Sequence, residues 1–272
     1  RDAEKAVWNA VRAQKYVSHI QEMIQISSPG IDRRNQKKEG MTIQSVGKDD
    51  VAANDLLDEF EKLIQIHDSY GAFRRLAAHP RLIDPVSQIL DGDVYMHQFK
   101  LNAKAAFDGA VWQWHQDYGT WKRDDGMPEP RAMNIAVFLD DVTAANGPLL
   151  FIPGSHKTGV IDAGHDLETT SYPLWTLDNE KVLELAERGG CVAPTGPAGS
   201  MLMFSSLLVH ASPPNISPFG RSIVYLSLCH VDNHIQKYNR EEWIAHRDFT
   251  PITKLDDNCL NELLNIGVSA AE

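Results

Sequence analysis

The part of the chain after about Asp91 constrains the fold most, because it consists of short apolar runs separated by Gly, Pro and Asn turn signals. No regular alternation with helices interrupts these runs, which favours antiparallel sheets in a sandwich or barrel over a doubly wound α/β fold. We expect the strands at Val94–Leu101, Trp112–His115, Asn134–Leu139, Leu149–Ile152, Ser200–Phe204, Leu207–His210 and Ser222–Cys229.

Helical periodicity dominates the residues before Asp91 and returns near the end of the sequence. Neither a linker nor a repeat is visible, so we expect one domain over residues 1–272, with a helical N-terminal part at about 1–80 and a β core at about 91–231. The fold class is then mainly β (α+β), with helical buttresses at both ends. The expected helices are Ala3–Ile26, Val51–His67, Tyr70–Ala78, Asn179–Glu187, Arg240–Ala245 and Asn258–Leu264, the third of them ending before Pro80.

The charge balance restricts the partners. Lys and Arg number 26 against 37 Asp and Glu, a formal net charge of −11, which argues against nucleic-acid binding. No apolar run approaches the length of about 20 residues that spans a bilayer, so we expect no membrane partner. The oligomeric state stays open. The three cysteines form no close pair, which indicates free thiols in the cytoplasm. The sequence begins with Arg1, so its natural start is expected upstream.

The sharpest local motif is His115-Gln116-Asp117. On a strand, residues two apart point to the same face, so this imidazole and this carboxylate can bind one metal from one side. A second histidine would complete the 2-His-1-carboxylate set that suits Fe(II). An H-x-D pair also occurs by chance, and the alternative is a surface histidine beside a strand-end aspartate.

The third ligand must come from another segment. His210 follows the apolar run Leu207–Val209, and Arg221 opens the next apolar strand. An arginine brought in by a neighbouring strand can hold a carboxylate through two parallel hydrogen bonds, although a surface arginine at a hairpin fits the same pattern. Among the other histidines, His230 and His234 are interpreted as an exposed loop, and His156 as the brace of a turn.

Three motifs in this order resemble the phytanoyl-CoA dioxygenase family. They are Trp114–Tyr118 with Asp125–Pro128, then Asn146–Leu149 with Ile152–His156, then His210–Ser212 with Arg221, and the likeness covers roughly Leu82–Val231. The resemblance implies a double-stranded β-helix (a jelly roll) and oxygenase chemistry with Fe(II), 2-oxoglutarate and O2.

The resemblance also implies roles for single residues. His115, Asp117 and His210 would be the metal ligands and catalytic centre. Within the family the chain is most similar to ectoine hydroxylases, although it has Gln116 and Lys100 where those enzymes usually have Ser and Arg. The implied cofactor-binding residues are Arg221, Ser212, Gln98 and Asn102, and the implied substrate-binding residues are Trp121, Thr120 and Gln98.

The expected function is therefore hydroxylation of an unactivated C–H bond, with release of succinate and CO2. The substrate would be a small polar or zwitterionic metabolite such as an amino-acid derivative, an ectoine-like compound or a phosphonate. Asp117 leaves no vacancy for a halide, which favours hydroxylation over halogenation. Two alternatives remain: a non-catalytic metal-binding jelly-roll protein, and a cupin-type enzyme that needs no 2-oxoglutarate.

Some basic residues have two interpretations. Lys100 and Lys104 are interpreted as solvated strand lysines, with carbonyl binding as the alternative. The run Arg33–Lys38 is interpreted as a solvated loop, with an anion-gripping lid as the alternative.

Overall fold

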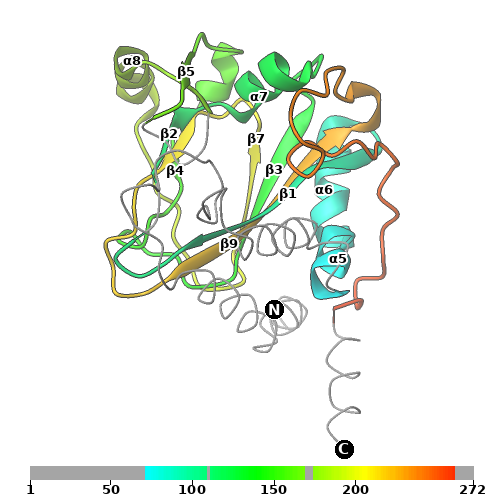
Figure 1. Cartoon of the computed structure of the whole chain (residues 1–272). Helices are drawn as coiled ribbons and strands as arrows, with labels where there is room; N and C mark the ends of the chain where they lie inside the picture. The colour runs from blue at the N-terminus through cyan, green and yellow to red at the C-terminus, as the bar shows by residue number, and fades with distance from the viewer. Residues whose placement is uncertain (1–70, 109–110, 169–173, 261–272) are drawn as a thin grey trace, which may run out of the picture.

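The computed structural model describes residues 71–108, 111–168 and 174–260 (Figure 1). The expected helices Ala3–Ile26 and Val51–His67 and the basic run Arg33–Lys38 lie outside these residues. The elements in chain order are α5 (Gly71–Ala77), α6 (Pro80–Leu90), β1 (Val94–Lys104), β2 (Trp112–His115), α7 (Asp117–Thr120), the π-helix η2 (Trp121–Asp125), β3 (Ala132–Phe138), β4 (Leu150–Phe151), the 3-10 helix η3 (Ser155–Thr158), β5 (Gly164–Asp166), β6 (Leu174–Thr176), α8 (Asn179–Gly189), β7 (Met201–Ser205), β8 (His210–Ser212), β9 (Arg221–His230) and the 3-10 helix η4 (Val231–Asn233).

The strands form two antiparallel sheets, which confirms the expected mainly β class with antiparallel pairing. One sheet has four strands in the order β1-β9-β3-β7, and the other has five in the order β4-β8-β2-β6-β5. Neighbouring strands are mostly far apart in the sequence, as β1 and β9 are. No helix in the described ranges is long and apolar enough to cross a membrane.

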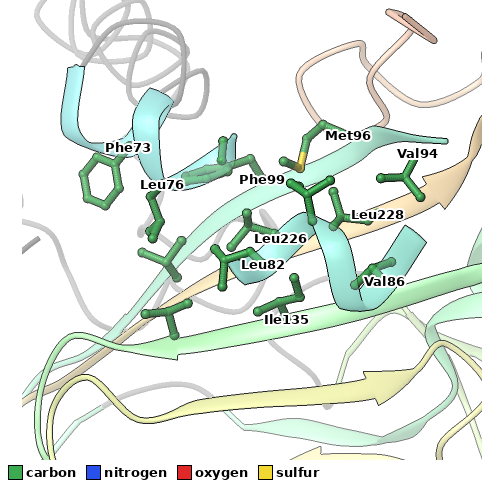
Figure 2. Packing of buried hydrophobic residues seen from close by; sticks show 14 of the residues in the cluster. Phe73, Leu76, Leu82, Val86, Val94, Met96, Phe99, Ile135, Leu226 and Leu228 are labelled. Carbon is green, nitrogen blue, oxygen red and sulfur yellow. The ribbon is translucent and has the colours of Figure 1, made fainter. Parts of the chain in front are cut away.

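The main core lies between the four-stranded sheet and the helices α5 and α6, which cover one face of that sheet (Figure 1). Figure 2 shows Leu82 and Val86 of α6 turned toward Ile135, Leu226 and Leu228 of the sheet. All five side chains are at most 5 % exposed, and burial of each contributes about 1.5–3 kcal/mol. This apolar face leaves the opposite face of the same sheet available for polar side chains.

A β-bulge in β1 decides which side chains reach that opposite face. The pairing of β1 with β9 shifts register between Met96 and Gln98. Met96 and Phe99 both belong to the helix-facing core, so the alternation of the strand changes phase at the bulge. From Gln98 onward, the even-numbered residues face away from the helices. The polar side chains placed there are Gln98, Lys100, Asn102 and Lys104, opposite Ser227, Tyr225, Ile223 and Arg221 of β9.

Helix α6 was not expected from the sequence, because Pro80 was interpreted as a stop signal. In the structure Pro80 is the first helical residue, where its missing N–H costs nothing and its fixed φ suits the helix. His79 precedes it as the N-cap and accepts a hydrogen bond from the Arg81 N–H. The helical part therefore extends to Leu90, beyond the predicted boundary near residue 80.

Two other expectations about elements were wrong. Leu207–His210 is not a strand: a turn follows β7, and β8 begins at His210. Arg240–Ala245 forms a turn rather than a helix, because tertiary contacts occupy this segment. The Arg240 guanidinium pairs with the buried Asp125, and the Ile244 carbonyl accepts from Gln98 Nε2. The described start of the expected helix Asn258–Leu264 is likewise a turn, and its remainder lies outside the described residues.

Candidate metal centre

The structure brings His115, Asp117 and His210 together. His115 on β2 and His210 on β8 are directly paired across the two strands, and their ring centroids are 4.1 Å apart. Asp117 Oδ1 lies 3.6 Å from His115 Nε2, and Asp117 Oδ2 lies 3.5 Å from His210 Nε2. The three possible ligand atoms lie within 4.8 Å of one another, a facial arrangement of two imidazoles and one carboxylate.

The route by which Asp117 reaches this position differs from the prediction. It does not lie on the strand of His115 but is the first residue of helix α7. Gln116 between them is still extended and is buried. Its Nε2 donates to the Gly159 and Leu207 carbonyls at 2.8 and 2.7 Å, and its Oε1 accepts from the Ile161 N–H at 2.9 Å. The residue between the two candidate ligands thus fixes the turn from strand to helix.

The two imidazoles are oriented for a metal. His115 Nδ1 lies 2.6 Å from the Gln113 carbonyl, and His210 Nδ1 lies 2.9 Å from the Leu208 carbonyl. A carbonyl only accepts hydrogen bonds, so each Nδ1 carries the hydrogen and each Nε2 presents its lone pair. Both Nε2 atoms face Asp117. Fixing the tautomer from behind in this way is typical of metal-ligating histidines, so the donor set fits a divalent metal such as Fe(II).

The carboxylate is held by neighbours on the four-stranded sheet. Asn134 Nδ2 donates to Asp117 Oδ2 at 2.7 Å, and Ser227 Oγ donates to Asn134 Oδ1 at 2.7 Å. Burial would raise the pKa of Asp117, but His210, His115 and Lys100 together hold it well below its usual range. Burial, reinforced by His115, lowers the pKa of His210 to about 4. Near neutral pH the centre therefore combines an ionised carboxylate with a neutral His210 ring, as metal binding requires.

A second cluster surrounds Arg221, the first residue of β9, whose side chain is buried. Its Nη1 donates to Asn102 Oδ1 at 2.7 Å, and its Nη2 donates to Ser212 Oγ at 3.2 Å. Its Nε and Nη2 also donate to the Gly147 carbonyl. Arg221, Asn102 and Ser212, all predicted to bind the cosubstrate, thus lie together. Ser212 is two residues after His210 on β8, which links this cluster to the metal centre.

Sequence reasoning missed Lys104 as a member of this cluster. It was interpreted as solvated, but it is 2 % exposed, and its Nζ donates to Ser212 Oγ at 2.7 Å and to the Pro213 carbonyl at 2.5 Å. Burial, reinforced by Arg221, lowers the pKa of Lys104 to about 6. The signal was its even-numbered position on β1, in phase with Asn102. The buried Arg221 guanidinium and the Lys104 amine, which a bound anion would favour in its charged form, together form a site suited to an anion.

Gln98 lies away from this cluster. Three residues separate it from Asn102, about 13 Å along the strand, and its Nε2 donates to the Ile244 carbonyl at 2.6 Å. The structure therefore separates Gln98 from Arg221, and its role in binding stays a prediction. Trp121 is buried, and its indole packs edge-on against the His97 ring at 4.8 Å. Thr120 Oγ1 is buried and has no hydrogen-bond partner among the described residues.

The remaining histidines of the sequence analysis lie elsewhere. His156 is exposed in η3, and His234 is exposed and stacks on Phe249 at 4.7 Å. His230 was expected in an exposed loop, but it is the buried last residue of β9, and its ring accepts a hydrogen bond from the Asp232 N–H. In the described ranges, the only group of three or more potential metal-binding side chains is His115, Asp117 and His210.

Comparisons with known proteins agree with this geometry. Among curated relatives, ectoine dioxygenase of Sphingopyxis alaskensis is 39 % identical over 186 residues, which cover 66 % of this chain and 61 % of that protein. L-proline trans-4-hydroxylase of Streptomyces griseoviridis is 33 % identical over 241 residues, 85 % of this chain and 89 % of that protein. The match to the first relative thus spans less than two thirds of its length.

Two crystal structures of EctD from S. alaskensis are similar to the described fold. The complex with 2-oxoglutarate and 5-hydroxyectoine has a TM-score of 0.62 and the complex with Fe a TM-score of 0.60, each at 37 % identity over 70 % of this chain and 65 % of the other. Iron and 2-oxoglutarate in these relatives agree with the predicted cofactors. Residues 7–223 match the family model described as phytanoyl-CoA dioxygenase (PhyH). The chain belongs to the phytanoyl-CoA dioxygenase family.

Proposed function

We propose that this protein is an Fe(II)- and 2-oxoglutarate-dependent oxygenase that hydroxylates an unactivated C–H bond of a small zwitterionic or polar metabolite. The observation that carries the proposal is an anion site next to the metal ligands, formed where β8 of the five-stranded sheet contacts β1 and β9 of the four-stranded sheet. His115, Asp117 and His210 offer one face of a metal, and Arg221 with Lys104 offers a buried anion site linked to them through β8. A dicarboxylate that chelates the metal at one end reaches a cation at the other.

In this proposal the side chains hold the iron and orient the cosubstrate. His115, Asp117 and His210 hold the iron, which with 2-oxoglutarate supplies the activation of O2. Arg221 and Lys104 bind the distal carboxylate of the cosubstrate, while Ser212 and Asn102 fix the guanidinium. Asn134 keeps Asp117 aimed at the metal. Exclusion of water by the surrounding buried side chains strengthens each of these electrostatic contacts.

Trp121, Thr120 and Gln98 are proposed to bind the substrate. The buried Thr120 hydroxyl lacks a partner among the described residues, and such a group is ordinarily satisfied by a ligand or by water. Gln98 keeps its Oε1 available, since its amide nitrogen is committed to the Ile244 carbonyl. The relatives are named for ectoine and for L-proline, both small cyclic amino acids, which supports this substrate class.

We further propose that the two sheets are the halves of a double-stranded β-helix within a single domain. The antiparallel pairing of β1 with β9 and of β2 with β8 supports it, as does the likeness to the EctD structures. A cytoplasmic location stays a prediction from the free cysteines.

The test is an anaerobic visible spectrum of the metal-free protein, titrated with Fe(II) and then with 2-oxoglutarate. We expect a weak charge-transfer band that needs both additions, and succinate formation when O2 and a substrate are admitted. The Ser212→Ala variant should need more 2-oxoglutarate for the same band. Absence of the band would favour a non-catalytic metal-binding protein, and turnover without 2-oxoglutarate would favour a cupin-type enzyme.

A further inference from the structure

Lys100 occupies a position that the proposed chemistry does not yet use. It lies on β1 between Gln98 and Asn102, on the sheet face that points away from helices α5 and α6, directly opposite Tyr225 of β9. The side chain is partly buried rather than solvated. A lysine on the inner face of a sheet ordinarily has an acidic or carbonyl partner close by, because an unpaired buried ammonium is costly.

Within residues 71–108, 111–168 and 174–260, no such partner lies within hydrogen-bond or ion-pair distance of the Lys100 ammonium. It differs in this from Lys104, whose Nζ is held by Ser212 and Pro213. The three donors of the Lys100 ammonium are thus left for a group that the folded chain does not supply.

The surroundings of Lys100 place its charge at the metal centre. Burial lowers the pKa of Lys100, while the Asp117 carboxylate opposes that effect and Arg240 adds to it. Lys100 also lowers the pKa values of Asp117 and His210, although other groups contribute more to each. The ammonium is therefore an electrostatic neighbour of the candidate iron ligands. Arg240 is neutralised by the buried Asp125, with which it forms two hydrogen bonds, whereas the opposite charge that acts on Lys100 is Asp117, itself a candidate metal ligand.

Lys100 is separated from the cosubstrate cluster. Three residues lie between Lys100 and Lys104, which are about 13 Å apart along the strand. Lys104 and Arg221 form one anion site, and Lys100 forms a second on the other side of Asn102. The carboxylate that Lys104 and Arg221 would hold is therefore separated from Lys100. Lys100 is left as a second cationic position at the metal centre, next to Gln98.

Gln98 offers the complementary group beside Lys100. The two residues are neighbours on the same face of β1, about 7 Å apart along the strand. Gln98 Nε2 donates to the Ile244 carbonyl, which assigns the amide orientation and leaves Oε1 as an acceptor. Oε1 accepts no hydrogen bond from a described residue. A free acceptor next to a free ammonium matches a molecule that carries an ammonium group and a carboxylate on neighbouring atoms.

We propose that Lys100 binds the carboxylate of the substrate, while Gln98 Oε1 accepts from its amino group, so that this pair selects free amino acids and cyclic amino acids. This inference rests on the proposed function, because it uses the same metal centre. It makes Lys100 a specificity-determining residue and predicts that neutral or purely cationic analogues bind weakly.

The experiment measures binding through the iron–2-oxoglutarate charge-transfer band under argon. A panel of amino acids and cyclic amino acids, L-proline and ectoine included, is titrated beside the matching carboxamides such as L-prolinamide. We expect at least one free acid to shift the band, with its carboxamide at least 10-fold weaker. In Lys100→Gln, acid binding should weaken on the order of 10- to 100-fold while carboxamide binding stays nearly constant, because only a charge-assisted contact is lost. Lys100→Arg should keep most of the preference.

Lys122→Gln is the matched control, because this substitution removes the same charge from an exposed lysine that follows Trp121 in the sequence. It should leave acid binding unchanged. Equal responses to acid and carboxamide, or no response to any acid while the band is intact, would overturn the inference and leave the proposed function standing. A Lys100→Gln protein that instead needed far more 2-oxoglutarate would also overturn it, because Lys100 would then serve the cosubstrate. A missing band would refute the proposed function and this inference together.

Discussion

Binding of 2-oxoglutarate should draw a proton onto Lys104, and this uptake can be counted. Burial beside Arg221 lowers the pKa of Lys104 to about 6 from its ordinary value of 10.5, so the amine is mostly neutral at physiological pH in the free protein. A carboxylate placed against Lys104 favours the charged form and raises that pKa again. The perturbation to make is Lys104→Met, which keeps the length of the side chain and removes the amine.

The number of protons taken up on binding follows from the pKa of Lys104 in the free protein. With a pKa of about 6, about 3 % of Lys104 is protonated at pH 7.5. If the bound carboxylate restores a pKa of about 9 or more, each binding event takes up nearly one proton. Between about pH 6 and the raised pKa of the complex, affinity must then fall as the pH rises, by up to tenfold per unit. Below about pH 6 Lys104 is already charged in the free protein, and the dependence disappears.

The assay is isothermal titration calorimetry of the Fe(II)-loaded protein with 2-oxoglutarate under argon, in buffers of differing ionisation enthalpy. The slope of the observed enthalpy against the buffer enthalpy gives the number of protons taken up. The native protein should give close to one proton at pH 7.5 and Lys104→Met close to none, with affinity lower on the order of 10- to 100-fold. Lys122→Gln, which changes an exposed lysine, serves as the control. Equal proton uptake in the native protein and in Lys104→Met would refute the reasoning.

Three further changes probe the two clusters. Asp117→Ala should abolish hydroxylation and leave the circular dichroism spectrum unchanged, and full activity would remove Asp117 from the ligand set. Arg221→Ala should raise the KM for 2-oxoglutarate at least 30-fold, since a buried carboxylate loses a partner worth on the order of 2–5 kcal/mol; an unchanged KM would point to another residue. Gly147→Ala should raise the same KM with little effect on kcat at saturation, because its φ is +74° and a Cβ there would lie 2.8 Å from Lys104 Cδ; native kinetics would show that Lys104 yields freely.

The residues of the metal centre could be predicted from the sequence because each of them lies in a short, recognisable motif. His115 and Asp117 are two residues apart, His210 ends one strand-like segment, and Arg221 opens the next. That pattern led to the three side chains that the structure gathers, although their role as ligands stays a prediction. The supposed reason for the convergence was wrong, since a strand-to-helix turn rather than a single strand aims Asp117.

The residues that support the site could not be predicted from local sequence patterns. Asn134 and Ser227 lie on strands far from Asp117 in the sequence, and nothing in either strand marks a hydrogen bond to a carboxylate. Lys104 carries an ambiguous signal, because an alternating strand lysine is equally typical of a solvated face. Only the pairing of β1 with β9, which sets Lys104 opposite Arg221, shows that this face is buried. Pairing between distant strands is the information that local patterns lack.

The β-bulge between Met96 and Gln98 sets where β1 can change in length. Met96 pairs with Leu228 and Gln98 with the next residue of β9, Ser227, so His97 is the additional residue, and its deletion would leave Phe99 and Lys104 on their present faces. A deletion of one residue between Gln98 and Lys104 would instead shift the remaining residues by one position against β9, and Lys104 would then point at helices α5 and α6. Within this part of β1, new substrate preferences can therefore arise through exchanges of single side chains at alternate positions, but not through insertions or deletions of single residues.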